Sequence, residues 1–569
     1  MRLQLRNLCS EDRLPASLHP LLRRVYLNRG LAQAEELDLS LERLLPFNSL
    51  KGIDEAVLLL VCALDQQWRV LVVGDYDADG ATGTAVAVTA LRQFGLRDVG
   101  YLVPDRFRYG YGLTPEIVQL ARVQQPDLLI TVDNGISSIE GVAAARLAGM
   151  RVLITDHHLP GAVLPDADAM VNPNQPGCAF PSKALAGVGV IFYVMIALRA
   201  QLRARGAAAL PNLAELLDLV ALGTVADVVP LDQNNRILVQ NGLSRMRTGR
   251  ARPGLRALAQ VAGRSPAQLT SGDLGFFLGP RLNAAGRLEN MARGIECLMS
   301  QDDATALTMA RELDTLNRER RDLQTQMQEE ALAVAESIEA RHGAEELPYG
   351  LCLYDAAWHQ GVVGLVATRL RERYHRPAIV FAPGDEAGAT LKGSGRSVPG
   401  FHIRDALDAI AARHPGLISR FGGHAMAAGL SLEHAQLAAF TEAFAAETRR
   451  LLRPEQIQRV IESDGELSAA DCGLEGAQAL RDGGPWGQGF PEPQFHGHFE
   501  VAEARVVGEQ HLKLKLRRPE QNHTLDAIAF RETRPLAVGS QILAAYRLEV
   551  NEYRGLLSPQ LVIEALEPA

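Results

Sequence analysis

The chain of 569 residues lacks an apolar run long enough to span a bilayer. Its longest apolar run, 184–198, falls short of the roughly 20 residues that a transmembrane helix needs. The opening MRLQLRNLCSEDRLP also lacks the apolar core of a signal peptide. We therefore expect a soluble, cytoplasmic protein that has no membrane partner.

Cysteine pairs, sequence repeats and an excess of positive charge are missing as well. The six cysteines are scattered without C-x-x-C spacing, which indicates neither a disulfide framework nor a zinc knuckle. The net charge of -9 argues against a protein that coats nucleic acid with its whole surface, but it is compatible with a local basic groove. The composition is globular, and the length exceeds what one hydrophobic core organises, so we expect three or four domains.

The first half of the chain has the pattern of a parallel sheet. Short apolar segments alternate with helix-like stretches, which is typical of βαβ units. The expected strands are RVLVVGD (69–75), DVGYLVP (98–104), DLLITVD (127–133) and RVLITDHH (151–158), and the expected helices are 81–95, 114–124, 137–149, 187–204 and 212–222. From there to about residue 300, an Arg- and Gly-rich region is expected to be less regular.

The second half predicts a connecting helix and two further domains. Apolar residues at helical spacing predict one long helix over 302–342, with a two-helix hairpin as the alternative. The segments LCLYD and AIVFAP flank a helical stretch and predict a second α/β unit, and alternating segments after residue 456 predict a small β-barrel. The expected boundaries are 1–301, 302–343, 344–455 and 456–569.

Acidic residues and histidines follow three of the expected strands, and one more acid follows an apolar helical stretch. These residues are Asp75, Asp77 and Asp79, Asp133, Asp156 with His157 and His158, and Asp227. Because the carboxyl ends of parallel strands share one edge, the side chains are expected to meet there. Carboxylates with imidazole suit two Mg²⁺ or Mn²⁺ ions that act on a phosphoryl centre. The alternative is a solvated edge of capping residues.

Eight motifs give the chain a family resemblance. GDYDADG (74–80), TVDNG (131–135), TDHH (155–158) and GTVADVVPL (223–231) resemble the four motifs of the DHH phosphoesterase superfamily. GPRLNAAGRL (279–288), WHQGVVGLVATRL (358–370), GSGRS (393–397) and FGGHAMAAG (421–429) narrow the resemblance to the bacterial RecJ family. The resemblance covers nearly the whole chain. It implies an α/β protein whose parallel-sheet DHH domain is joined by a long helix to a smaller α/β DHH-associated domain, with a C-terminal OB-fold β-barrel.

The resemblance also implies roles at the strand edge. The implied metal ligands, for two Mn²⁺ or Mg²⁺ ions, are Asp77, Asp79, Asp133, His157 and Asp227, with Asp133 as the bridge. His158 is implied to face the scissile phosphate, and Asp156 is expected to be a turn or supporting residue. Many superfamily members have a histidine where this chain has Val73, so Asp75 is expected to replace it, directly or through water.

Further residues are implied to hold the DNA strand. They are Arg106 and Tyr111 for a phosphate and a base, Arg281, Asn283 and Arg287 for the backbone, Ser394 and Arg396 for the 5′-phosphate, and His424 on the phosphate side. Three of these predictions have structural alternatives: GSGRS also suits a plain turn, Tyr111 a packed loop, and His424 a hydrogen-bonded structural histidine. The alternating Lys513, Lys515 and Arg517 give one basic strand face, whereas Trp486 and Phe490 are expected to pack against the barrel.

The implied function is a single-strand-specific 5′-to-3′ DNA exonuclease that releases 5′-mononucleotides in repair and recombination. The implied partners are single-stranded DNA, single-strand-binding protein and recombination helicases. Two alternatives remain at this stage. One is a phosphodiesterase for short oligonucleotides or cyclic dinucleotides, and the other is a non-catalytic DNA-binding scaffold of the same fold.

Overall fold

The structure is a computed structural model that describes residues 2–7, 9–109, 111–342, 347–385, 387–518, 523–553 and 555–568. Within these ranges, the side chains at 106, 107, 337–342 and 553 are not described. The chain divides into two compact units, and we describe each by itself. The first comprises Leu3–Asn317 and Glu462–Ala569, and the second Arg318–Ile461.

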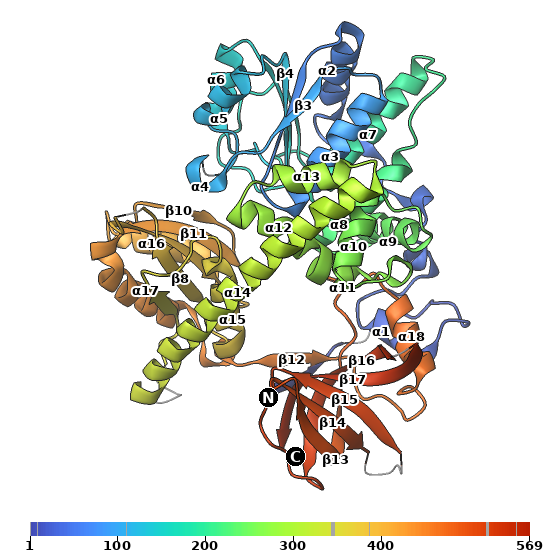
Figure 1. Cartoon of the computed structure of the whole chain (residues 1–569), viewed down its shortest axis with the longest axis vertical. Coiled ribbons are helices and arrows are strands. Elements are labelled where there is room, and N and C mark those ends of the chain that lie inside the picture. The colour runs from blue at the N-terminus through green and yellow to red at the C-terminus, as the bar shows by residue number, and fades with distance from the viewer. Residues whose placement is uncertain are drawn as a thin grey trace. The chain divides into compact units, whose positions relative to one another are not determined.

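A five-stranded parallel sheet organises the first unit, with strand order β3-β2-β4-β5-β6 (Figure 1). Its strands are β2 (Val70–Gly74), β3 (Val99–Leu102), β4 (Leu128–Val132), β5 (Arg151–Thr155) and β6 (Ala169–Val171). Side chains of β2 alternate between two hydrophobic cores, Val70 and Val72 on one face and Leu71 and Val73 on the other. Burial on both faces explains why these strands are continuous apolar runs. The four expected strands are confirmed.

Helices cover both faces of this sheet. The helices before and around the strands are α1 (Pro20–Leu27), α2 (Ile53–Gln66), α3 (Ala78–Gln93), α4 (Arg106–Tyr109), α5 (Pro115–Arg122), α6 (Ile139–Leu147), α7 (Gly187–Ala204) and α8 (Leu217–Ala226). Helices α5 and α6 pack on one face, and α2, α3 and α7 on the other. By length and composition α7 could cross a membrane, but 61% of it is buried inside the protein, as befits a core helix.

The region after α8 is more regular than the sequence indicates. It contains α9 (Gln233–Arg247), α10 (Pro253–Val261), α11 (Ser271–Asp273), the π-helix η6 (Leu274–Leu278), α12 (Gly279–Leu288) and α13 (Ala292–Met299). The expectation of irregular structure is therefore wrong. Its glycines serve close packing: a Cβ at Gly242 would come 2.3 Å from the Leu217 carbonyl oxygen, and one at Gly254 would come 2.1 Å from that of Cys297.

One helix of 40 residues, α14 (Asp303–His342), continues from the first unit into the second. A single helix is therefore present over the expected range, and the hairpin alternative is wrong. The described residues also include single-turn 3-10 helices: η1 (Ala34–Leu37), η2 (Leu41–Arg43), η3 (Phe47–Ser49), η4 (Leu213–Leu216), η5 (Pro266–Gln268), η8 (His434–Gln436) and η9 (Pro454–Ile457).

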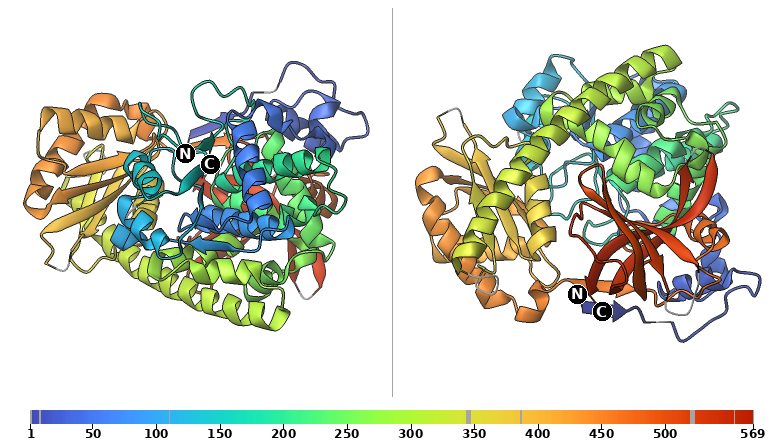
Figure 2. Two further views of the ribbon diagram at one scale, coloured as in Figure 1. Left: turned by 90° about the horizontal axis from the view of Figure 1, so that it is seen from above. Right: turned by 60° about the horizontal axis from the view of Figure 1, so that its bottom comes forward.

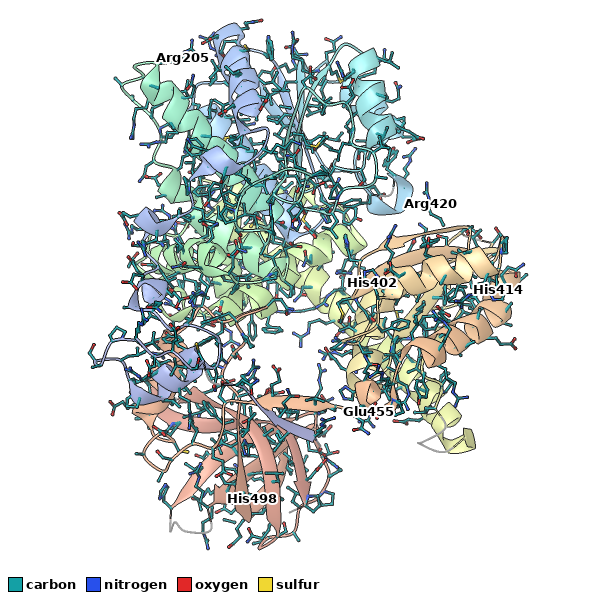
Figure 3. The ribbon with its side chains drawn as sticks, turned by 180° about the vertical axis from the view of Figure 1, so that it is seen from behind. Arg205, His402, His414, Arg420, Glu455 and His498 are labelled. Carbon is teal, nitrogen blue, oxygen red and sulfur yellow. The ribbon has the colours of Figure 1, made fainter. Side chains whose placement is uncertain are left out.

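The second unit is a mixed five-stranded sheet with order β10-β11-β9-β8-β7. Its elements are β7 (Leu351–Tyr354), α15 (Val363–Tyr374), β8 (Ala378–Pro383), β9 (Thr390–Arg396), α16 (Ile403–Arg413), β10 (Arg420–Gly423), β11 (Ala427–Glu433) and α17 (Leu437–Leu451). Figure 3 labels His402 and His414 at the two ends of α16 and Arg420 at the start of β10. The expected α/β unit is confirmed.

A closed five-stranded barrel forms the C-terminal part of the first unit (Figure 2). Its strands are β13 (Phe495–Val507), β14 (His511–Arg517), β15 (Thr524–Phe530), β16 (Gln541–Tyr553) and β17 (Leu556–Pro568), and α18 (Leu474–Asp482) precedes them. The short strands β1 (Arg2–Leu5) and β12 (Val460–Ser463) are the remaining elements. Trp486 and Phe490 stack with ring centroids 5.1 Å apart and are buried, and both rings lie near Tyr26 of α1, with centroids 6.1 and 6.4 Å away. Both are therefore packed side chains, and packing against the barrel itself stays a prediction.

Candidate metal centre

The segment GDYDADG connects buried strand β2 to helix α3. Asp77 is the N-cap of α3: its Oδ1 accepts hydrogen bonds from the backbone N–H groups of Asp79 and Gly80, both at 3.0 Å. This satisfies donors that a helix start leaves open and places a negative charge at the positive end of the helix dipole. The acidic loop is therefore fixed in place by the helix that follows it.

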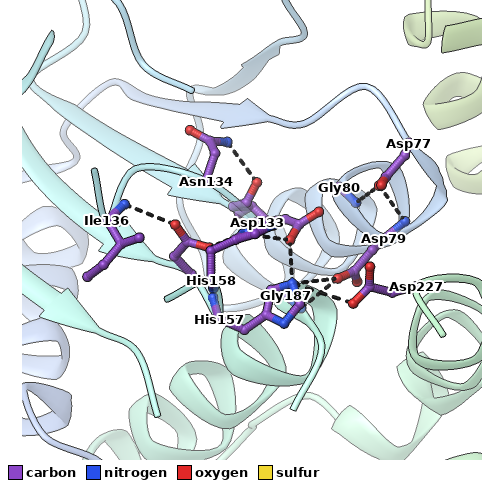
Figure 4. Close-up of polar contacts among 12 residues, drawn as sticks. Asp77, Asp79, Gly80, Asp133, Asn134, Ile136, His157, His158, Gly187 and Asp227 are labelled. Carbon is purple, nitrogen blue, oxygen red and sulfur yellow. Dashed lines mark hydrogen bonds and ion pairs between the residues drawn. The ribbon is translucent and has the colours of Figure 1, made fainter. Parts of the chain in front are cut away.

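Asp79 is 1% exposed and is held by the start of α7. Its Oδ2 and Oδ1 accept hydrogen bonds from the backbone N–H groups of Gly187 and Val188, at 2.6 and 2.8 Å (Figure 4). A Cβ at Gly187 would lie 2.5 Å from the Cβ of Asp133. Glycine at this position therefore allows Asp79 and Asp133 to approach the same helix end.

Asp133 follows β4 directly and is 1% exposed. Its φ of +64° lies in the left-handed region, which is uncommon outside glycine and is tolerated best by Asp and Asn. The Asp133 N–H donates to the carbonyl oxygen of Thr155 at 3.0 Å, at the end of neighbouring strand β5. The turn thus directs the carboxylate toward the histidines that follow β5.

Asp156 organises the two histidines of TDHH. It is fully buried, and its Oδ1 accepts hydrogen bonds from the backbone N–H groups of His157 and His158 at 2.7 and 3.1 Å. The same oxygen lies 2.7 Å from Nδ1 of His158, and Oδ2 accepts from the Ile136 N–H at 2.9 Å. Asp156 therefore has the supporting position that the sequence predicts.

The four motifs converge on His157 and Asp133 (Figure 4). His157 Nε2 lies 3.1 Å from Asp133 Oδ1, 3.4 Å from Asp227 Oδ2 and 4.0 Å from Asp79 Oδ2. Ligand atoms gather within 4.8 Å of one another in three groups: Asp133 with His157 and His158, Asp79 with His157 and Asp227, and Asp75 with Asp77 and Asp133. Asp133 belongs to two of these groups, so it joins one ligand set to the next.

Burial and mutual repulsion disfavour the charged forms of the carboxylates. Burial and the charge of Asp77 raise the pKa of Asp79 to about 7. Burial and the neighbouring aspartates, Asp79 first, also raise the pKa values of Asp133 and Asp227 well above the usual range. For His158, burial would lower the pKa, but the hydrogen bond and charge of Asp156 raise it. The protein alone therefore leaves like charges uncompensated at this edge.

These features fit a pair of hard divalent cations. Among the described residues, the buried Asp133 Oδ1 and Asp227 Oδ2 have no hydrogen-bond partner, which is unusual for buried oxygens. Carboxylates and imidazole are ligands for Mg²⁺ and Mn²⁺. The second group together with Asp133 suits one ion, and Asp75 with Asp77 suits a second ion that shares Asp133. The solvated-edge alternative does not fit, because Asp75, Asp79 and Asp133 are buried.

Among the predicted strand-binding residues, Tyr111 and Asn283 contact the site. The Tyr111 hydroxyl lies 2.9 Å from His158 Nδ1 and donates to the Asp133 carbonyl oxygen at 3.1 Å. Asn283 Oδ1 accepts from the Ala78 N–H at 2.7 Å. Arg281 is buried and donates to Asp314 at 2.9 Å. Arg287 lies in the last turn of α12. The Arg106 side chain lies outside the described residues, and the DNA roles of all five stay predictions.

Ser394, Arg396 and His424 belong to the second unit, so they are described apart from the metal centre. GSGR lies in the central strand β9, where its backbone pairs with β8 and β11. The plain-turn alternative for GSGRS is therefore wrong. Ser394 and Arg396 still share one face, with the Arg396 guanidinium 3.0 Å from the Ser394 hydroxyl. His424 lies between β10 and β11 and is exposed.

Sequence reasoning missed the backbone groups of Gly187 and Val188 that hold Asp79. It also missed Asn172 and Asn174, whose side chains donate to the carbonyl oxygens of His158 and His157 at 3.0 and 2.6 Å. The pairing of Gly187 with Gly189 at the start of an apolar helix was the available signal. Nothing in the spacing of Asn172 and Asn174 indicates which loop they support.

Three family models match the chain in the order of its domains. The DHH family N-terminal domain matches residues 69–224, the DHHA1 domain 348–449 and the RecJ OB domain 463–565. The first match includes the three strand-end motifs described above and ends before Asp227, which follows helix α8. The predicted fold class, with DHH, DHH-associated and OB-fold parts, is therefore confirmed.

Curated relatives and solved structures extend the similarity to the whole chain. The single-stranded-DNA-specific exonuclease RecJ of Dickeya dadantii is 53% identical over 98% of both chains. That of Escherichia coli is 51% identical over 98% of this chain and 97% of its own length. The crystal structure of RecJ from Thermus thermophilus in complex with Mn²⁺ matches with a TM-score of 0.81 and 31% identity, covering 100% of this chain and 80% of that one. The chain therefore belongs to the RecJ family of single-stranded-DNA-specific exonucleases.

Proposed function

We propose that this chain is a metal-dependent exonuclease that degrades single-stranded DNA from the 5′ end and releases 5′-mononucleotides. The observation that carries the proposal is the convergence of Asp79, Asp133, His157 and Asp227 within one buried group of atoms. A scaffold has no need for such a costly cluster. A relative that is 53% identical is named a single-stranded-DNA-specific exonuclease.

Asp75, Asp77, Asp79, Asp133, His157 and Asp227 would hold two Mn²⁺ or Mg²⁺ ions, with Asp133 shared. Related structures in complex with Mn²⁺ and with Mg²⁺ support this cofactor. When bound, such ions polarise a phosphoryl oxygen and activate water for attack on phosphorus. The carboxylates position the ions, and the turn at Asp133 sets the direction of the shared ligand.

His158 acts on the scissile phosphate in this proposal. Asp156 holds its Nδ1 at 2.7 Å and raises its pKa, so the protonated ring is favoured. Nε2 is then the nitrogen that donates to a phosphate oxygen and stabilises developing negative charge. The Tyr111 hydroxyl at 2.9 Å restrains the ring, so Asp156 and Tyr111 together fix its orientation.

The remaining predicted residues hold the strand. Ser394 and Arg396 bind the 5′-phosphate, His424 contacts a nearby phosphate, and Arg106, Arg281, Asn283 and Arg287 contact the backbone. The domain boundaries 1–301, 302–343, 344–455 and 456–569 are part of this proposal. So are a cytoplasmic location, a role in repair and recombination, and partnership with single-strand-binding protein and recombination helicases.

A digestion assay with Mn²⁺ tests the proposal. Single strands labelled at either end and a blunt duplex are incubated with wild type and with Asp227→Ala, which suits the helical backbone at this position (φ -75°, ψ -11°). We expect early release of the 5′ label as mononucleotide, late release of the 3′ label, an intact duplex and an inactive variant. Binding without any cleavage would favour a scaffold, and cleavage of very short oligomers alone would favour an oligonucleotide phosphodiesterase.

A further inference from the structure

A cavity of about 350 Å³ lies beside the acidic loop, and none of the roles above uses it. Its lining includes Tyr76, Asp105, Leu288, Glu289, Asn290 and Met291. They come from the loop after β2, the segment after β3 and the end of α12 with the turn that follows it. All belong to the first unit, so the cavity is complete within it.

The cavity is coupled to the metal centre through Tyr76. This residue stands between Asp75 and Asp77, which both belong to the group that includes Asp133. Helix α12 packs directly on the loop, because a Cβ at Gly286 would come 1.8 Å from the Tyr76 carbonyl oxygen. The Tyr76 ring meets the Tyr111 ring edge-on, with centroids 6.4 Å apart. The cavity is therefore one aromatic contact away from the residue that restrains His158.

The lining combines an apolar interior with an acidic rim. Met291 is buried, and Tyr76 and Leu288 are half-buried. Asp105 and Glu289 are exposed at the edge. Two carboxylates repel a phosphate but accept hydrogen bonds from uncharged donors. Asn290 also lines the cavity, and its Oδ1 accepts a hydrogen bond from the Ala292 N–H at 2.8 Å. This lining suits a flat, uncharged ring with amino groups at its edge.

We propose that this cavity binds the base of one of the first three nucleotides at the 5′ end and favours bases that carry an amino group over thymine. The inference rests on the proposed function, because the single strand supplies the base. Tyr76 and Met291 contact the ring, and Asp105 and Glu289 accept from cytosine N4, adenine N6 or guanine N1 and N2. Holding one base beside the acidic loop positions its strand for the next cleavage.

Base removal tests the inference on the wild-type protein. Single-turnover rates with Mn²⁺ are measured on strands that carry one abasic site at the first, second or third position. Removal at one position should slow cleavage about tenfold, within the range of base-stacking contributions. Tyr76→Ala and Leu288→Ala should each reduce this dependence on the base to about twofold or less. Two variants are used because a folding defect in one of them would leave the other to test the inference.

The acidic rim has its own test. At the sensitive position, wild type should cleave a strand with cytosine about threefold faster than one with thymine, and Asp105→Asn combined with Glu289→Gln should bring this ratio close to one. Glu442→Gln in α17 of the second unit, another exposed glutamate, is the matched control and should keep the ratio.

The outcomes separate this inference from the proposed function. Equal wild-type rates with and without each base would overturn the base site and leave the exonuclease intact. A base effect that survives both Tyr76→Ala and Leu288→Ala would place the base elsewhere and overturn it too. Absence of any hydrolysis by wild type would overturn both proposals.

Discussion

Two buried polar clusters in the first unit differ in whether their charges are matched. Near the barrel, Arg29 and Asp464 are 1% and 0% exposed and pair at 2.9 Å. Arg29 also donates to the carbonyl oxygens of Val25 and Pro491, and Asp464 also accepts from Asn28 and Gln494. At the metal centre, by contrast, Asp79, Asp133 and Asp227 gather around His157, and burial together with mutual repulsion raises their pKa values.

The difference shows which cluster serves the fold and which serves chemistry. A buried ion pair whose hydrogen bonds are all formed needs no ligand to compensate its charges. The Arg29–Asp464 cluster therefore stabilises the packing of the segment before the barrel against the end of helix α1. A buried group of like charges is tolerated only where a ligand compensates it. Charge matching therefore distinguishes the Arg29–Asp464 cluster, which stabilises the fold, from the metal centre, which serves function.

The largest effect is expected for the substitution Asp133→Asn at the metal centre. Asparagine keeps the size of the side chain and tolerates the left-handed backbone at φ +64°. Activity with Mn²⁺ should fall at least about a thousandfold, or ~4 kcal/mol, because the shared ligand loses its charge. In EDTA at pH 8, however, the variant should unfold at a higher temperature than wild type, because one repelling charge is gone. Equal loss of activity and metal-free stability would contradict the functional interpretation of the cluster.

The matched cluster should respond in the opposite way. Asp464→Ala leaves the Arg29 guanidinium buried without its partner and should lower the free energy of unfolding by about 3 kcal/mol. Urea unfolding of the full chain measures it, and activity per folded molecule should change little. The control is Asp65→Ala, which removes an exposed partner of Arg205 (Figure 3) at 2.9 Å and should cost less than about 1 kcal/mol. Equal effects of the two variants would show that burial does not matter here.

Protons should compete with cations at the unmatched cluster. The Asp79 pKa is raised to about 7, so its proton favours the metal-free fold below this pH. That stabilisation is lost as pH rises from about 4, where the unfolded carboxyl titrates, through 7. Below pH 7 the cation must displace the proton, and competition at Asp79 should lower the Mn²⁺ affinity about fivefold between pH 7 and 6. Calorimetry in two buffers with different ionisation enthalpies counts the protons that Mn²⁺ binding releases. Binding that is independent of pH and releases no protons would show that protons and Mn²⁺ do not compete at this site.

The metal centre was largely predictable from the sequence, whereas the Arg29–Asp464 cluster was not. The parallel strands were predictable because burial on both faces produces apolar runs such as Val70–Gly74. The ends of parallel strands share an edge, so the meeting of Asp79, Asp133 and His157 followed from topology. The eight motifs then supplied the family.

The rest was hidden because it depends on contacts between distant segments. Arg29 and Asp464 are 435 residues apart, and neither lies in a recognisable motif. The glycines of GSGRS indicated a turn, yet they lie in strand β9. Glycine is needed there because Cβ atoms at Gly393 and Gly395 would lie only 2.5 and 2.6 Å from Phe381 and Ile403. The helices after α8 escaped notice for a similar reason, since their glycines serve close helix packing. Glycine can therefore mark the close approach of two segments as well as a turn.

The smallest predicted effects compare one hydrogen bond in each cluster. Tyr111→Phe removes the hydroxyl that contacts His158 and the Asp133 carbonyl oxygen, so kcat should fall about fivefold, or ~1 kcal/mol. The ring remains, so KM should stay constant, whereas Tyr111→Ala should raise KM as well because a stacking surface is lost. Asn28→Ala removes the bond to Asp464 at 2.9 Å and should lower stability by about 1 kcal/mol with kcat unchanged. If Tyr111→Phe instead lowered stability and left kcat unchanged, the Tyr111 hydroxyl would have a structural role and would not be part of the functional cluster.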